Sequence, residues 1–357
     1  MQESRFRDWL IINDKKYTAG ELMNIDKSVL PEWEKANYEF ISQWLDGKPW
    51  IEVQTSGSTG APKTIKIQKS TMIQSALNTA AFFGLKQGDA ALMCLPASYI
   101  AGKMMIVRTF VLGLNLHWQK PSASPVVSRN FKFAAMTPMQ VQNIINTDKK
   151  QLEKIENLIL GGAPVNDFIK KNLRNLNTKA YETYGMTETA SHIAIKPLNP
   201  AAGKEEYFTV LEGIEIGVDE RSCLKVINSN LGIKNIVTND IINLVDKNKF
   251  LWLGRFDNII NSGGIKLIPE QIEAKIKPFI NSSFIVFGIK DEKYNEIPAL
   301  IVEGDMPLDL ERLKKVLDKF EFPKRIFRYD KFPRSSTGKI QRKALIKNIT
   351  EEYRLDG

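Results

Sequence analysis

Short apolar runs that end at proline or at paired glycines restrict the fold of this chain more than any other feature. One run is AALMCLPAS (residues 90–98), which stops at Pro96, and another is IENLILGGAPV (155–165), which leads into a helix predicted from Asn166. Helices are also predicted over 31–46 and 68–84. Buried strands that alternate with helices predict an α/β fold with a mainly parallel sheet. Ligands bind at the carboxyl ends of such strands, so the turn Gly161-Gly162 is a candidate site loop.

The second half of the chain has a different pattern. From about residue 200 to 256 the runs become shorter and more β-like, which predicts a β-rich subdomain. The chain then predicts a compact α+β unit in this order: helix 269–279, strand 283–289, strand 298–303, helix 308–320 and a basic tail. A chain of 357 residues is too long for one average domain, so we expect a large and a small one.

The loop TSGSTGAPK (55–63) nearly fits the Walker pattern for a phosphate loop. Pro62 stands where that pattern has its second glycine, and proline has no N–H to offer a phosphate. Free N–H groups, hydroxyls and Lys63 could still converge on one polyphosphate. The alternative is a polar surface loop before the strand-like TIKIQ.

Charge and apolar patterning exclude several classes of protein. The chain has a net charge of +9, but its lysines are spread along the sequence and no nucleic-acid-binding motif is present. No nucleic-acid partner is therefore predicted. The apolar stretch 90–116 is interrupted by Lys103 and Arg108, so no membrane insertion is predicted. The N-terminus lacks the apolar segment of a signal peptide, which favours a cytoplasmic location.

Cysteine and histidine are scarce. Cys94 and Cys223 lie in apolar surroundings and predict buried thiols of a reducing compartment. The two histidines, His117 and His192, give little support to a histidine metal site or a Ser-His-Asp triad.

Five segments in a fixed order carry the chemistry. They are TSGSTGAPK (55–63), YGMTETASHI (184–193), Asp240 in VTNDIINL (237–244), GRFDNIINSGGIKLIPEQIE (254–273) and PRSSTGKIQRKAL (333–345). Together they resemble the motifs of the adenylate-forming superfamily, which includes acyl-CoA synthetases, nonribosomal-peptide adenylation domains and firefly luciferase. The family reaction joins a carboxylate to AMP, releases diphosphate and passes the acyl group to a thiol. The resemblance therefore implies ATP, Mg²⁺ and coenzyme A.

The resemblance also implies roles for single residues. The phosphate-loop residues would hold the β- and γ-phosphates: Thr55, Ser56, Gly57, Ser58, Thr59, Gly60 and Lys63. Thr187 would bind the α-phosphate and Glu188 would hold Mg²⁺, a hard ion that prefers carboxylate oxygen. Lys339 would be the catalytic lysine that stabilises charge between the carboxylate and the α-phosphate. Glu188 could instead be an ordinary helix-start carboxylate, and Lys339 part of a solvated tail.

The nucleoside would be held by other segments. Tyr184 would pack on adenine, beside the turn Gly161, Gly162 and Ala163. Asp240 would accept from the ribose hydroxyls with Arg255 nearby, although the family usually has Thr-Gly-Asp where this chain has Thr238-Asn239-Asp240. Asn tolerates turn conformations, so Asp240 is kept, with a plain turn residue as the alternative.

A moving domain is implied as well. The hinge position matches Asp257, which divides the chain into an adenylate-forming domain (1–256) and a mobile domain (257–357). A hinge residue must absorb a large change in φ and ψ. Gly263 and Gly264 would border the pantetheine channel, unless they form only a tight turn.

The acid substrate is indicated by two features. The phosphate loop begins about fifty residues in, and a short N-terminal region is seen in some o-succinylbenzoate–CoA ligases of menaquinone synthesis. LPASYIAGKMMIVR (95–108) resembles their substrate segment, with Tyr99 in place of histidine and Ala101 in place of serine. A second carboxylate on the acid would need a cation or strong donors. The candidate substrate-binding residues are Tyr99, Lys103, Arg108, Ser191 and His192. Lys103 and Arg108 could instead be solvated helix positions.

We therefore expect an AMP-forming o-succinylbenzoate–CoA ligase that acts on a small-molecule carboxylic acid. Three alternatives stay open: another aryl- or acyl-CoA ligase, an enzyme that loads a carrier-protein thiol, and an inactive nucleotide-binding regulatory protein. A homo-oligomer also stays open, in which a second subunit completes the acyl pocket.

Overall fold

The computed structural model describes residues 6–54, 64–203, 205–334, 338 and 340–353. Two compact units make up the chain. The first unit comprises Met1–Glu215 with Val226–Asn235, and the second comprises Ile216–Lys225 with Ile236–Gly357. Strands β12 (Ile214–Val218) and β13 (Cys223–Ser229) run through the boundary between them. The domain boundary predicted at Asp257 lies inside the second unit and stays a prediction.

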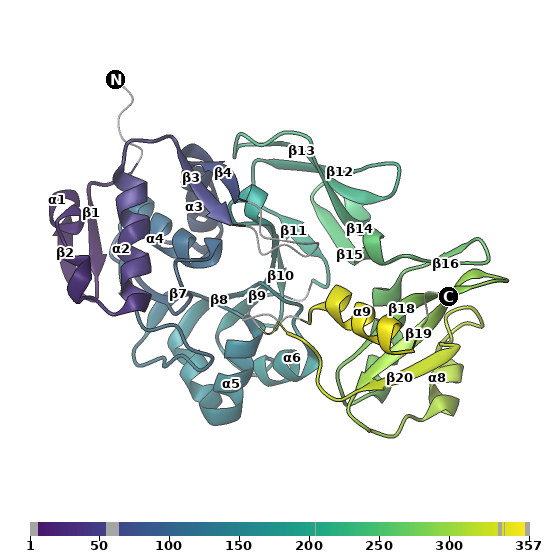
Figure 1. The fold of residues 1–357 in the computed structure, drawn as a ribbon. Helices are drawn as coiled ribbons and strands as arrows, with labels where there is room; N and C mark the ends of the chain where they lie inside the picture. Colours follow the sequence, from purple (N-terminus) through teal and green to yellow (C-terminus); the bar gives the residue numbers. More distant parts are fainter. Residues whose placement is uncertain (1–5, 55–63, 204, 335–337, 339, 354–357) are drawn as a thin grey trace. The chain divides into compact units, whose positions relative to one another are not determined.

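The first unit is built on a sheet whose central strands are parallel (Figure 1). Along the sheet the order is β11-β10-β9-β8-β7-β5-β6-β1-β2. Its strands are β1 (Trp9–Ile12), β2 (Lys15–Thr18), β5 (Ala90–Met93), β6 (Asn115–Trp118), β7 (Phe131–Met136), β8 (Ile155–Leu160), β9 (Lys179–Gly185), β10 (His192–Pro197) and β11 (Phe208–Val210). The pairs from β1–β6 through β8–β9 are parallel, and β2, β10 and β11 pair antiparallel at the two sides. The predicted mainly parallel sheet is confirmed.

Helices cover this sheet. They are α1 (Ala19–Met23), α2 (Glu32–Leu45), α3 (Lys69–Phe83), α4 (Ile100–Leu112), α5 (Pro138–Asp148) and α6 (Asp167–Leu173), with 3₁₀ turns η1 (Lys27–Val29) and η2 (Lys149–Lys154). The predicted helices over 31–46 and 68–84 and from Asn166 are confirmed as α2, α3 and α6. Asn166 caps α6, because its side-chain oxygen accepts from the backbone N–H of Ile169.

Apolar side chains of β5, β7 and β8 pack against α5 and α6 to form the core of this unit. The cluster includes Leu92, Cys94, Leu158 and Ile169, all buried. Cys94 and Cys223 are both buried and unpaired, as predicted. Among the described residues no helix is long and apolar enough to cross a bilayer. The hairpin β3 (Trp50–Gln54) and β4 (Thr64–Gln68) flanks the segment 55–63.

The second unit contains a long antiparallel hairpin and a separate sheet. The hairpin is β14 (Ile236–Asp246) with β15 (Lys249–Arg255), followed by the 3₁₀ turn η4 (Phe256–Asn258). The sheet has the order β17-β16-β19-β18, with β20 parallel to β19. Its strands are β16 (Ile260–Ser262), β17 (Ile265–Leu267), β18 (Phe284–Asp291), β19 (Asn295–Glu303) and β20 (Arg325–Tyr329). Strands β18 and β19 confirm the two predicted strands.

Helices of the second unit differ in part from the prediction. α7 (Pro269–Ile276) ends early and continues as the 3₁₀ turn η5 (Lys277–Phe279), because Pro278 lacks the N–H that a further α-helical turn needs. α8 (Leu310–Val316) is shorter than the predicted 308–320. The predicted basic tail contains a helix that the sequence pattern did not indicate, α9 (Arg342–Tyr353). Leu345 and Ile349, one helical turn apart, are fully buried in the apolar cluster beside β18 and β20.

Candidate active site

The carboxyl ends of β8 and β9 bring two predicted site segments to one edge of the sheet. The two strands are parallel neighbours, so Gly161-Gly162, after β8, and η3 (Thr187–Thr189), after β9, lie at the same edge. A Cβ on Gly161 would lie 2.6 Å from Thr183 Oγ1 of β9, and Gly162 has φ of +85°. Glycine is therefore required for this turn to lie against β9.

Between β9 and β10 the chain reverses through a strained turn. Ala190 has φ of +61° and ψ of −36°, and Ser191 N donates to Thr189 O at 2.7 Å, which closes a γ-turn around it. Such backbone costs on the order of 1–3 kcal/mol in a residue other than glycine. Thr189 Oγ1 stabilises the turn through Met186 and through the Ser191 carbonyl.

The reversal places Ser191 and His192 against the end of β9. His192 pairs with Gly185, and a Cβ on Gly185 would lie 2.4 Å from the Ser191 carbonyl oxygen. Only glycine at 185 permits this approach. The predicted α-phosphate ligand Thr187 and the predicted substrate residues Ser191 and His192 are therefore held on one short turn.

Arg108 of α4 contacts the same turn. Its side chain is buried, with 1% exposed. Nη2 donates to Ser191 Oγ at 2.9 Å, Nε lies 3.4 Å from Thr79 Oγ1, and the guanidinium lies 5.5 Å from the centre of the Phe133 ring. Burial lowers the pKa of the guanidinium to about 10, which still leaves it charged at neutral pH.

A defined proton arrangement follows from these contacts. Ser191 Oγ accepts from Arg108, so its own hydrogen is available to His192 Nδ1, 3.2 Å away. Burial, and then the charge of Arg108, lower the pKa of His192 to about 3, so the ring is neutral. The ring hydrogen then resides on Nε2, which is buried and has no hydrogen-bond partner among the described residues.

The charge of Arg108 is not compensated within the part of the chain that the structure describes, where no carboxylate pairs with it. A buried cation without a counter-ion is costly, and a buried donor without an acceptor adds to that cost. An anion beside Arg108 and His192 would offset both costs.

Lys103 takes another direction. It lies five residues before Arg108, about 140° around the helix. Its ammonium group lies 4.7 Å from the centre of the Phe40 ring of α2, whereas Arg108 contacts Thr79, Phe133 and Ser191. Burial lowers its pKa to about 8. The alternative that Lys103 and Arg108 are solvated helix positions was wrong for both, since Lys103 is only 8% exposed. The structure does not bring Lys103 to Ser191 and His192.

The start of α4 is packed tightly onto the loop that follows β5. A Cβ on Gly102 would lie 2.2 Å from the Pro96 carbonyl oxygen. Tyr99 is the residue before the helix and is 42% exposed. The close approach at Gly102 fixes the position of the whole segment 95–108, and with it Arg108.

Glu188 and Tyr184 occupy the same turn and strand end. Glu188 is exposed in η3, and no ion pair within the described chain engages it. A single available carboxylate fits Mg²⁺, which proteins usually hold through one or two carboxylates together with substrate phosphates. No cluster of three or more metal-binding side chains occurs in the described ranges. The Tyr184 ring lies 5.9 Å from that of Phe208.

In the second unit, Asp240 and Arg255 face each other across the β14–β15 hairpin. They are register partners, and Arg255 Nη1 lies 3.4 Å from Asp240 Oδ1. Trp252 Nε1 donates to the same oxygen at 3.1 Å. The other guanidinium nitrogen, Nη2, pairs with Asp257 at 3.1 Å. The predicted ribose ligand and the predicted hinge residue are therefore joined through Arg255.

Gly263 and Gly264 form the two-residue turn between β16 and β17. Ser262 pairs with Ile265 in register, and both glycines have positive φ, +59° and +85°. This combination is a type I′ hairpin turn. The tight turn is present, and a role at a pantetheine channel stays a prediction.

Part of the predicted site lies outside the described residues. This holds for Thr55, Ser56, Gly57, Ser58, Thr59, Gly60 and Lys63 of the phosphate loop and for Lys339. Thr79, Phe133 and Arg221 were missed by the sequence reasoning. Each lies far along the chain from its partners, and no spacing or motif could have indicated it.

Comparisons with known proteins agree on one family. The profile described as "AMP-binding enzyme" matches residues 51–219. A 2-succinylbenzoate–CoA ligase of Bacillus pumilus is 26% identical over 91% of this chain and 74% of its own length. The crystal structure of an acyl-CoA synthetase (AMP-forming)/AMP-acid ligase II-like protein from Dyadobacter fermentans is 34% identical, with a TM-score of 0.63, and the match covers 92% of this chain and 98% of that one. An o-succinylbenzoate coenzyme A synthetase from Bacillus subtilis, solved with ATP and magnesium ion, is 21% identical with a TM-score of 0.68, over 83% of this chain and 69% of that one.

Proposed function

The chain belongs to the adenylate-forming superfamily of AMP-binding enzymes, and on that premise we propose that it is an acid–CoA ligase specific for an aromatic acid with a second carboxylate, o-succinylbenzoate. The class of reaction, an AMP-forming acyl-CoA ligase, follows from the family.

The observation that carries the substrate proposal is the uncompensated charge of Arg108. An acid whose only carboxylate is activated gives Arg108 no partner once that carboxylate has become an acyl-phosphate anhydride. A dicarboxylate leaves one anionic group, which Arg108 would bind. The Nε2–H of His192 would donate to the same group. Arg108 and His192 both connect to Ser191, so one carboxylate within reach of that side chain would satisfy both.

The activating half of the site would act mainly by positioning charges. ATP and a carboxylate repel each other, so donors and cations must hold them together. We propose that the phosphate loop, 55–63, holds the β- and γ-phosphates and that Thr187 donates to the α-phosphate. Mg²⁺ at Glu188 would neutralise phosphate charge. Lys339 would stabilise the negative charge that develops as the carboxylate oxygen attacks the α-phosphorus and diphosphate leaves.

In the second half-reaction, the thiol of coenzyme A would have to take the place beside the acyl-adenylate that Lys339 occupies during adenylation. We propose that rotation at Asp257 exchanges these groups and that Gly263-Gly264 borders the path of pantetheine. The thiol of coenzyme A then attacks the acyl carbon, AMP leaves, and the thioester is formed. Tyr184, Gly161, Gly162, Ala163, Asp240 and Arg255 would retain the nucleoside through both steps.

Two findings support the aromatic dicarboxylic acid beyond Arg108. The matched ligase of Bacillus pumilus acts on 2-succinylbenzoate by its name, and so does the Bacillus subtilis synthetase. Chain length is not a support, because the match leaves part of the Bacillus pumilus ligase uncovered, whereas it covers 98% of a generic acyl-CoA synthetase.

The test is diphosphate release from ATP and Mg²⁺ with o-succinylbenzoate, first without and then with coenzyme A. We expect turnover that depends on coenzyme A, with o-succinylbenzoyl-CoA as product. Release with benzoates or fatty acids but not with o-succinylbenzoate would keep the class of enzyme and remove this substrate. Acyl transfer to a pantetheinylated carrier protein but not to coenzyme A would indicate a carrier-loading enzyme.

A further inference from the structure

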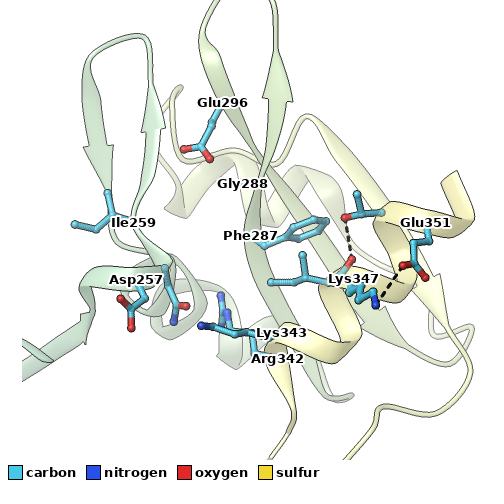
Figure 2. Close-up of a pocket in the computed structure, with 12 residues that line it drawn as sticks. Asp257, Ile259, Phe287, Gly288, Glu296, Arg342, Lys343, Lys347 and Glu351 are labelled. Carbon is cyan, nitrogen blue, oxygen red and sulfur yellow. Dashed lines mark hydrogen bonds and ion pairs between the residues drawn. The ribbon is translucent and has the colours of Figure 1, made fainter. Parts of the chain in front are cut away.

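Polar contacts hold much of the turn that precedes the second sheet. None of the residues Phe256–Asn258 of η4 is buried. Asp257, Asn258 and Ile259 line a hollow of about 440 Å³, with Arg342, Lys343 and Lys347 of α9 on its other side (Figure 2). Because open space adjoins η4, a change in its backbone displaces little packed side-chain volume. Its conformation therefore depends on the hydrogen bonds that it makes.

Both carboxylate oxygens of Asp257 are bound by the hairpin that comes before it. Asn239 Nδ2 donates to Oδ1 at 3.1 Å, and Arg255 Nη2 donates to Oδ2 at 3.1 Å. Asn239 and Arg255 come from β14 and β15, so the end of the hairpin is tied to the turn that follows it.

Asn239 is itself held in place from its other side. Arg221 Nη1 donates to Asn239 Oδ1 at 3.1 Å, and the same guanidinium is bound by Asp219 at 2.8 Å and lies 4.9 Å from the centre of the Phe256 ring. The amide of Asn239 thus receives a hydrogen bond from Arg221 and gives one to Asp257. This fixes which end of the amide faces Asp257.

Position 239 is where the resemblance leads one to expect glycine. Asn239 lies in β14 and is not one of the residues with positive φ, so this backbone does not need a glycine. A glycine here could make neither side-chain hydrogen bond. The asparagine therefore adds a contact to Asp257 that the usual motif lacks.

We infer that Asn239 is a positioning residue that latches η4 and so sets how readily the chain changes conformation at Asp257. This inference rests on the proposed function for its consequence, which is control of the balance between adenylate formation and acyl transfer. The latch itself is a property of the fold and can be measured without any substrate.

Hydrogen exchange of one backbone amide reports the latch. Ile259 N donates to Phe256 O at 3.2 Å, so this amide exchanges only when η4 opens. Asn239→Gly should speed exchange at Ile259 about fivefold, the effect of one ordinary hydrogen bond. Asn239→Asp should speed it further, because two carboxylates would then face each other.

The matched control is Asn243→Gly, which makes the same change on the same strand at an exposed position opposite Leu251. It should leave exchange at Ile259 within about twofold, well below the loss of one hydrogen bond. Equal acceleration in both glycine variants, or in neither, overturns the latch.

The consequence is tested by the two half-reactions. Labelled diphosphate exchange into ATP measures adenylation, and transfer from preformed acyl-adenylate to coenzyme A measures the second step. Asn239→Gly should change the ratio of their rates by about fivefold, in line with the exchange of Ile259. An unchanged ratio despite faster exchange would remove the control role. If no acid is adenylated, the proposed function fails while the exchange measurement still decides the latch.

Discussion

Replacing Arg108 with methionine separates a role in binding from a role in folding. The change removes a donor to Ser191 and the contact with the Phe133 ring, worth about 1.5–3 and about 2 kcal/mol respectively. It also removes a cation that is 1% exposed and uncompensated, and burying an ion costs several kcal/mol. These effects oppose each other, so the free energy of unfolding should change by less than about 2 kcal/mol.

The effect on catalysis should be larger and selective. Losing one partner of a buried charge pair costs about 2–5 kcal/mol. At 1.4 kcal/mol per tenfold, the middle of that range lowers kcat/KM for o-succinylbenzoate about 300-fold. For 4-oxo-4-phenylbutanoate, in which a hydrogen replaces the ring carboxylate and the succinyl carboxylate is kept for activation, Arg108 has no second carboxylate to bind. There the loss should stay below about fivefold, because only packing changes.

The assay is coupled diphosphate release with each acid, together with urea unfolding of each variant. Arg129→Met is the matched control, since Arg129 is exposed and pairs with Asp14 at the surface of the same unit. Equal loss of activity toward both acids would mean that Arg108 only supports the fold. Unchanged kcat/KM toward o-succinylbenzoate would refute the reasoning altogether.

Further predictions concern pH, stability and catalysis. Burial lowers the pKa of His192 to about 3, so below pH 6.5 the unfolded chain gains a proton that the folded chain excludes. Urea titrations should therefore show that the free energy of unfolding falls by about 2 kcal/mol more between pH 7 and pH 5 in the wild type than in His192→Gln. An equal fall in both proteins would contradict this. Lys103→Met should stabilise the protein by about 1–3 kcal/mol at pH 7, because its buried ammonium, with a pKa lowered to about 8, is charged there. That gain should shrink between pH 8 and 10.5, as the folded chain loses the proton first, and a constant gain would argue for packing alone. Lys339→Ala should abolish diphosphate exchange while calorimetry shows ATP still bound, and normal exchange would remove its role. Gly185→Ala should lower stability by about 2 kcal/mol in thermal melts, since its Cβ would lie 2.4 Å from the Ser191 carbonyl oxygen, and an unchanged melting temperature would contradict that clash.

Local sequence was sufficient where neighbouring residues decide the structure. Apolar runs bounded by Pro96 or by Gly161-Gly162 indicated the buried strands β5 and β8. A strand that is covered on both faces of a sheet is apolar at every position, so the continuous run is itself the signal. α9 was not predicted, because its buried apolar residues, Leu345 and Ile349, are too few among charged and polar neighbours to give a clear helical periodicity. Its stability comes from burial against β18 and β20, which are distant in sequence.

The sequence by itself determined the α/β class, the order of the motifs and therefore the family, since each depends on residue types at short spacing. Only the tertiary structure decided which of the two candidate cations, Lys103 or Arg108, contacts Ser191. Both are cations on one helix, but Arg108 and Lys103 face different neighbours, Thr79 and Phe133 for one and Phe40 for the other. It alone also showed that Asn239 contacts Asp257, eighteen residues further on. Such contacts depend on how strands and helices pack in space, which no local pattern encodes.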